Sequence, residues 1–84
     1  MWKAKIEVTL KKSVLDPQGV TVEKSLAALG YSNVRDMRVG KYLELTLEDV
    51  TRAEAQEQVQ EMCLRLLVNP VIEDYTFTLV EGKR

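Results

Sequence analysis

Few side chains in this chain could carry catalysis. Its single cysteine, Cys63, could act as a nucleophile, but it falls among apolar residues at helical spacing, and the chain has no histidine to activate a thiol. We therefore expect Cys63 to be an inert core thiol. One cysteine and no histidine also exclude an internal disulfide and a multi-cysteine zinc site.

Two pairs of adjacent carboxylates, Glu48-Asp49 and Glu73-Asp74, are the other candidates for acid–base chemistry or Mg²⁺ binding. Both pairs lie at the ends of expected elements, and neighbouring side chains on a strand point to opposite faces. Ordinary solvated charge is the simpler interpretation. The glycines are isolated, so the chain also lacks a glycine-rich phosphate loop. We expect no catalytic, cofactor-binding or metal-binding residue in this chain.

A short basic run offers binding instead of catalysis. Arg35, Arg38 and Lys41 could meet a phosphate or an acidic partner, and Gly40 would let another backbone approach closely. With the adjacent Tyr42, these residues form the candidate partner interface. The alternative is a solvated strand face with no partner.

Composition limits the partners further. The 84 residues include 12 basic and 13 acidic side chains, a net charge of −1, so no overall field attracts nucleic acid or an anionic membrane surface. No apolar run approaches the ~20 residues of a membrane span, and no signal-peptide pattern begins the chain. We expect one cytoplasmic domain, residues 1–84, that binds neither nucleic acid nor membrane. A domain of 84 residues can bury only a small hydrophobic core, and such domains often gain stability by forming oligomers.

In the first half of the chain, the alternation of apolar and polar residues predicts a strand, and helix-capping residues predict a helix. Apolar residues at even positions from Trp2 to Leu10 predict a strand with one buried face. Asp16 has the position of a helix N-cap, Pro17 suits the first helical position, and Gly30 ends the helix.

The second half predicts a helix and a last strand. Thr51 and Glu54 have the spacing of a capping box. A wide apolar stripe follows, which marks a helix packed on a core; its members are Ala55, Val59, Met62, Cys63, Leu66 and Leu67. Alternation from Val71 to Glu81 predicts the last strand.

The stretch from Val34 to Leu47 alternates like a strand and has Gly40-Lys41 at its centre. A two-residue turn at this pair would separate the apolar residues before it from the leucines after it, because paired residues share a face. Two arrangements keep them together. A three-residue loop, Gly40-Lys41-Tyr42, gives a compact ferredoxin-like monomer. A straight strand through the pair requires a second subunit to cover its far half, as in a segment-swapped dimer.

The fold class that follows is α+β, with the order β-α-β-α-β and a long central strand. Each strand alternates and each helix has one apolar stripe, which favours a ferredoxin-related antiparallel sheet with two helices on one face.

Three segments together resemble one family, the PurS subunit of phosphoribosylformylglycinamidine synthase. The resemblance covers essentially the whole chain and rests on Val14-Leu15-Asp16-Pro17-Gln18-Gly19, on residues 34–42 and on residues 66–75. It implies a non-catalytic structural subunit of a ligase in de novo purine biosynthesis. It also implies a segment-swapped dimer, alone or paired as a tetramer, and so favours the straight strand.

The same resemblance implies the partners. They are a large synthetase subunit, which uses ATP and Mg²⁺, and a glutaminase subunit that releases ammonia. The small subunit would bridge them and assist ammonia transfer. The alternative function is a ferredoxin-like regulatory domain that senses a small molecule at a dimer interface. A nucleic-acid-binding module is disfavoured because Lys3, Lys5, Glu44 and Thr46 provide no aromatic stacking platform.

Overall fold

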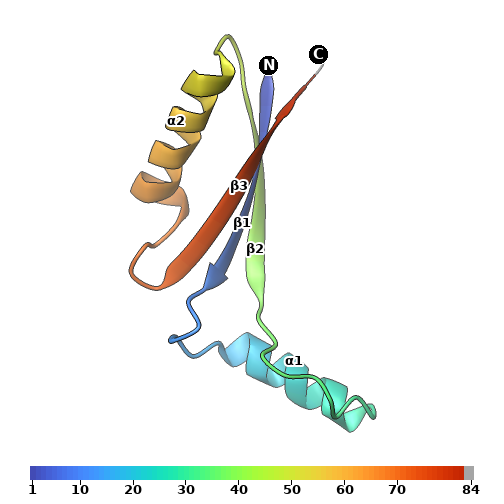
Figure 1. Cartoon of the computed structure of the whole chain (residues 1–84). Helices are drawn as coiled ribbons and strands as arrows, with labels where there is room; N and C mark the ends of the chain where they lie inside the picture. Colours follow the sequence, from blue (N-terminus) through green and yellow to red (C-terminus); the bar gives the residue numbers. More distant parts are fainter. Residues whose placement is uncertain (83–84) are drawn as a thin grey trace.

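Three antiparallel strands form the centre of the computed structural model, which describes residues 1–82 (Figure 1). The strands are β1 (Trp2–Leu10), β2 (Gly40–Leu47) and β3 (Glu73–Glu81), in the order β2-β1-β3. In β1, Ile6 lies opposite Leu43 on one side and Phe77 on the other. This register places most apolar residues of the three strands on one face of the sheet, whereas Val80, opposite Lys3, lies on the other face.

Helix α2 (Arg52–Met62) lies along this apolar face (Figure 1). The core is made by β1 side chains meeting the helix and the segment that follows it, and its buried members are Ala4, Ile6, Val8, Val59, Cys63 and Val68. Leucines of β2 and aromatic residues of β3 are partly buried around this cluster. The core is therefore centred on β1 and the inner side of α2.

The start of α2 has the predicted capping box. The Thr51 hydroxyl oxygen accepts the Glu54 N–H at 3.2 Å, and Oε1 of Glu54 accepts the Thr51 N–H at 3.1 Å. The end of the helix differs from the prediction, because residues Cys63–Leu67 form a π-helical turn closed by a 2.9 Å bond from the Val68 N–H to the Cys63 carbonyl oxygen. The wider turn rotates Leu66 out of the apolar stripe and leaves it 83% exposed.

The expected long strand from Val34 to Leu47 is wrong in its first half. Strand β2 begins only at Gly40, and Asp36 has a φ of 56°, a left-handed conformation that interrupts extended backbone. Gly40 pairs with Thr9 at the strand start, so Gly40-Lys41 is neither a hairpin loop nor the middle of a straight strand. The physical reason is that the preceding segment bonds to the connection after β1 instead of to a neighbouring strand.

Helix α1 (Pro17–Ala28) does not cover the sheet, which corrects the prediction of two helices on one face. Figure 1 shows α1 projecting beyond the end of the sheet, away from α2. Its one buried residue is Gly19. We call residues 11–39, which are α1 with its two connecting segments, the arm. The α+β class, the β-α-β-α-β order and the antiparallel pairing are as predicted.

Candidate functional site

Cys63 lies in the core, as predicted. Its side chain is fully buried beside β1, and burial raises the pKa of the thiol. A protonated, inaccessible thiol has no nucleophilic role at neutral pH. Within residues 1–82, no three His, Cys, Asp or Glu side chains are grouped so as to hold a metal ion, and no helix is both long and apolar enough to cross a membrane.

The Glu73-Asp74 pair does not form a carboxylate dyad. Oε1 of Glu73 accepts the Asn69 N–H at 2.7 Å, and its Oε2 lies 3.8 Å from Nζ of Lys41. Asp74 follows Glu73 on β3, so its side chain points to the opposite face of the sheet. Glu73 therefore orders the turn before β3 and partly neutralises Lys41.

Asp16 joins the two segments that connect the arm to the sheet. Its Oδ1 accepts the Gly19 N–H at 3.0 Å, which caps α1, and its Oδ2 accepts the Val39 N–H at 2.8 Å, next to the start of β2. The pKa of this buried carboxyl is lowered, first by the Gly19 bond, then by the Val39 bond, and also by the charge of Arg38. One side chain thus holds the beginning of α1 against the beginning of β2.

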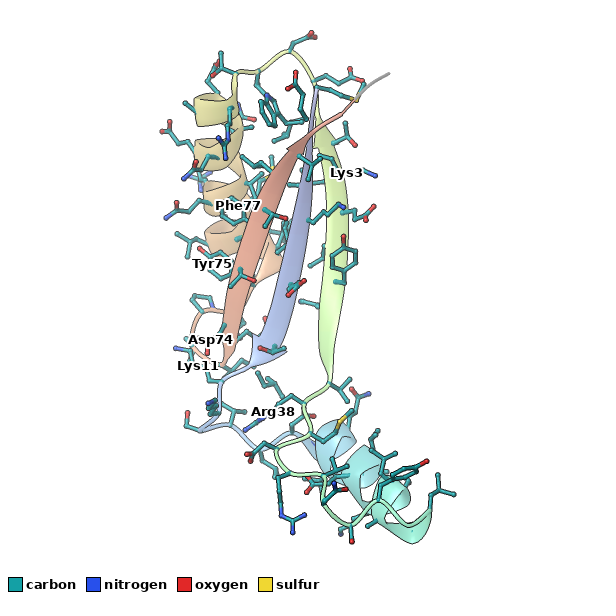
Figure 2. All side chains as sticks on the ribbon, turned by 45° about the vertical axis from the view of Figure 1, so that its right-hand side comes forward. Lys3, Lys11, Arg38, Asp74, Tyr75 and Phe77 are labelled. Atoms are coloured by element: carbon teal, nitrogen blue, oxygen red, sulfur yellow. The ribbon has the colours of Figure 1, made fainter. Side chains whose placement is uncertain are left out.

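Arg38 makes the same connection from the other segment. Its Nη1 donates to the Val14 carbonyl oxygen and its Nη2 to the Lys12 carbonyl oxygen, both at 2.9 Å. Figure 2 shows Arg38 at the junction between the sheet and α1. The guanidinium group therefore binds its own chain, on the segment that leaves β1.

Gly19 brings the two segments into direct backbone contact. A Cβ at this position would collide with the Met37 carbonyl oxygen and lie 2.9 Å from Oδ2 of Asp16. Only glycine allows this approach. We call Asp16, Gly19, Met37, Arg38 and Val39 the arm root. Sequence reasoning assigned Asp16 only as a helix cap, although it lies in a segment that carries the family resemblance.

The structure does not gather the five predicted interface residues on one surface. Arg38 is in the arm root, whereas Arg35 is exposed on the arm and donates to the Ser32 and Val34 carbonyl oxygens at 2.7 and 2.8 Å. Gly40 starts β2, where a Cβ would collide with the Val8 carbonyl oxygen.

Lys41 and Tyr42 point to opposite faces of the sheet, because they are neighbours on β2. Lys41 lies opposite Val8, on the face that carries the core, with half of its side chain exposed. The Tyr42 hydroxyl donates to Oε1 of Glu44 at 2.8 Å on the polar face, and this bond is the main cause of a raised pKa for the phenol. Contact of these five residues with a partner stays a prediction.

Two apolar surfaces are left uncovered by residues 1–82. The first is on the arm, where Leu29 is 75% exposed and other large apolar residues are also open to solvent, namely Leu15, Val20, Val22 and Tyr31. The second is a groove of about 410 Å³ beside α2, lined mainly by apolar side chains that include Leu45, Met62, Leu66 and Leu67. Surfaces of this kind mark interaction sites in monomers of this size.

Comparisons of the sequence and of the structure with known proteins both point to one family. Residues 3–81 match the PurS family, described as phosphoribosylformylglycinamidine (FGAM) synthase. The chain is 49% identical to the phosphoribosylformylglycinamidine synthase subunit PurS of Bacillus subtilis, over 96% of this chain and 95% of that protein.

Two solved structures extend the comparison. The crystal structure of Methanocaldococcus jannaschii PurS, described as one of the subunits of formylglycinamide ribonucleotide amidotransferase, superposes with a TM-score of 0.85 at 37% identity, covering 99% of this chain and 100% of that one. A chain in the structure of PurLQS from Thermotoga maritima superposes with a TM-score of 0.84 at 35% identity, covering 94% and 96%.

Proposed function

The chain belongs to the PurS family of phosphoribosylformylglycinamidine synthase subunits, which act in purine biosynthesis, and we propose that it joins the synthetase and glutaminase subunits and assists ammonia transfer between them. The observation that carries this proposal is the match over nearly the whole chain to PurS proteins, one of them within a PurLQS assembly. The alternative, a small-molecule sensor, is not favoured by any of these relatives.

We propose that the chain itself contributes no catalytic residue. Its buried thiol, its Lys41-neutralised Glu73 and its capping carboxylate Asp16 all have structural explanations. ATP and Mg²⁺ would be bound by the synthetase subunit, and the reaction would take place in the cytoplasm. The role of this chain is then to hold two catalytic subunits in a productive arrangement, with residues 1–84 acting as one domain.

We further propose that the chain works as a dimer, alone or as a pair of dimers. The support is that the arm is apolar and uncovered, and that the groove beside α2 is apolar and uncovered as well. An arm lying on the groove of a second copy would bury both surfaces in one step, because a twofold dimer repeats each contact. This is the segment exchange predicted from the sequence, carried by the arm instead of by a straight strand.

The five residues proposed to form the partner interface fall into two groups, according to whether their surroundings are solvent or the same chain. Arg35, Lys41 and Tyr42 have exposed side chains and are proposed to touch partners directly. Arg38 and Gly40 are proposed to act by shaping the junction that presents them, since their surroundings are backbone groups of the same chain.

Reconstitution tests the proposed function. The synthetase and glutaminase subunits are assayed for product with glutamine and, separately, with an ammonium salt, each with and without this chain. We expect glutamine-dependent turnover to require the chain, whereas ammonium-dependent turnover by the synthetase continues without it. Full glutamine-dependent turnover in its absence would contradict the proposal.

A further inference from the structure

The orientation of the arm relative to the sheet depends on the contacts of the arm root. Gly19 is the one residue of α1 that is buried, and the helix projects past the end of the sheet (Figure 1). Packing against the sheet therefore fixes little of its orientation. The two connecting segments are irregular, and irregular connections without further contacts are mobile. Besides a 2.8 Å bond from the Lys11 N–H to the Ile72 carbonyl oxygen, where the arm leaves β1, bonds between the two segments fix the arm.

Three side-chain bonds link these segments. Oδ2 of Asp16 accepts from the Val39 N–H, and Arg38 donates to the carbonyl oxygens of Val14 and Lys12, across sequence separations of 23, 24 and 26 residues. All three involve an ionised group, which makes such bonds shorter and stronger than neutral ones. Asp16, which makes one of these bonds, also lies beside the point where Gly19 meets the Met37 carbonyl oxygen, so the bonds and the close backbone approach act at the same junction.

We infer that Asp16 and Arg38 are positioning residues, which set the angle at which the arm leaves the sheet and so present it to a second copy of the chain. The last step rests on the proposed function, in which the arm takes part in assembly. The inference gives Arg38 a role different from direct binding of a partner. It also explains why a carboxylate that already caps α1 is held against Val39.

Two substitutions remove side-chain groups that make the bonds of the arm root. Asp16→Asn keeps an oxygen that can cap Gly19, because asparagine is as good an N-cap as aspartate, but it removes the second carboxylate oxygen facing Val39. Arg38→Gln removes the guanidinium fork. The matched control is Lys12→Gln, which removes one positive charge at the same place and leaves the Lys12 carbonyl oxygen available to Arg38.

The direct readout is the distance between the arm and the sheet. Spin labels are attached through Lys24→Cys on α1 and Thr78→Cys on β3, both exposed, while fully buried Cys63 stays unlabelled. Labelled chains are diluted with excess unlabelled chain so that pulsed electron paramagnetic resonance measures distances within one chain. We expect one narrow distribution for wild type and Lys12→Gln, and a broad one for Asp16→Asn and Arg38→Gln.

The second readout is self-association by analytical ultracentrifugation. We expect the dissociation constant to rise at least tenfold in both root variants and to stay within twofold of wild type in Lys12→Gln. Arg38→Lys, which keeps the charge and one donor, should recover part of the loss. A narrow distribution and unchanged association in both root variants would overturn the inference. So would loss of the β-sheet circular dichroism signal in both, because residues that only position the arm leave the sheet folded.

The two proposals fail separately. If wild type does not support glutamine-dependent turnover, the proposed function fails, but the distance and association measurements still decide the role of the root. If wild type supports turnover and the root variants match it in every readout, the positioning role fails and the proposed function stands.

Discussion

The carboxylate of Asp16 accepts the backbone N–H of Val39 at 2.8 Å, although the two residues are 23 positions apart in the sequence and a whole helix lies between them. This bond ties the start of α1 to the start of β2 and leaves α1 pointing away from the sheet that α2 covers. Held away from the core, the arm keeps its large apolar residues exposed, and this exposure is the basis of the proposed contact with a second copy.

The same bond predicts a pH dependence of stability. The folded pKa of Asp16 is lowered relative to an unfolded aspartate, near 3.9, so its contribution is present above that value and is lost as the pH falls through the folded pKa. We expect the urea midpoint of wild type to exceed that of Asp16→Asn at pH 6 and the difference to shrink below pH 4. Comparing the two proteins cancels the similar effects of Glu44 and Glu54. A constant difference down to pH 2 would contradict this account.

Gly40→Val should destabilise the sheet. A Cβ at Gly40 would meet the Val8 carbonyl oxygen and lie 2.8 Å from Cγ2 of Thr9, so β2 must shift away from β1. Overpacking of this kind costs roughly 1–3 kcal/mol in the free energy of unfolding, measured by urea denaturation. Thr46→Val, on the exposed face of the same strand, is the control and should cost little. Equal midpoints for the two variants would show that the close approach at Gly40 is unimportant.

Lys41→Glu should weaken assembly without changing helix content. Lys41 lies 3.8 Å from Glu73 on the core-bearing face with half of its side chain exposed, and we propose that it touches a partner. Reversing its charge places two carboxylates together and leaves Glu73 without its cation. The same charge change at exposed Arg52, on the first turn of α2, is the control. Sedimentation of the three proteins at equal concentration checks this, and wild-type association of Lys41→Glu would remove Lys41 from the interface.

Thr51→Ala should lower stability through the start of α2. The hydroxyl oxygen of Thr51 caps the Glu54 N–H, and loss of an N-cap costs roughly 0.5–2 kcal/mol. Gln56→Ala, exposed within the same helix, serves as the control and should be neutral or slightly stabilising. The check is the urea midpoint of each variant by circular dichroism. A Thr51→Ala midpoint equal to wild type would mean that the capping box contributes nothing.

Local signals predicted the elements that depend on local physics. Alternation gave β1 and all of β3, with a predicted start at Val71 that is two residues too early. The spacing of Thr51 and Glu54 gave the capping box, because a period or a cap needs only a few neighbouring residues. The π-helical turn after Met62 was missed. A π-helical turn contains one more residue than an α-helical turn, and the pattern of apolar residues in the sequence does not reveal this difference.

The direction of the arm could not be predicted in the same way. Residues 34–39 were expected to continue the strand, yet the Val39 N–H donates to a carboxylate that lies before α1, and Asp36 adopts a left-handed conformation. Both features depend on a contact across more than twenty residues. The five interface candidates were adjacent in sequence, but strand geometry sends Lys41 and Tyr42 to opposite faces.

Sedimentation equilibrium of the isolated chain, from micromolar to hundreds of micromolar, decides whether a second copy covers the arm and the groove beside α2. We expect twice or four times the mass of one chain. Leu66→Glu in the exposed groove should shift the population toward the single chain while the circular dichroism spectrum stays unchanged. A folded wild-type chain that keeps the mass of a monomer over the whole range would contradict this expectation.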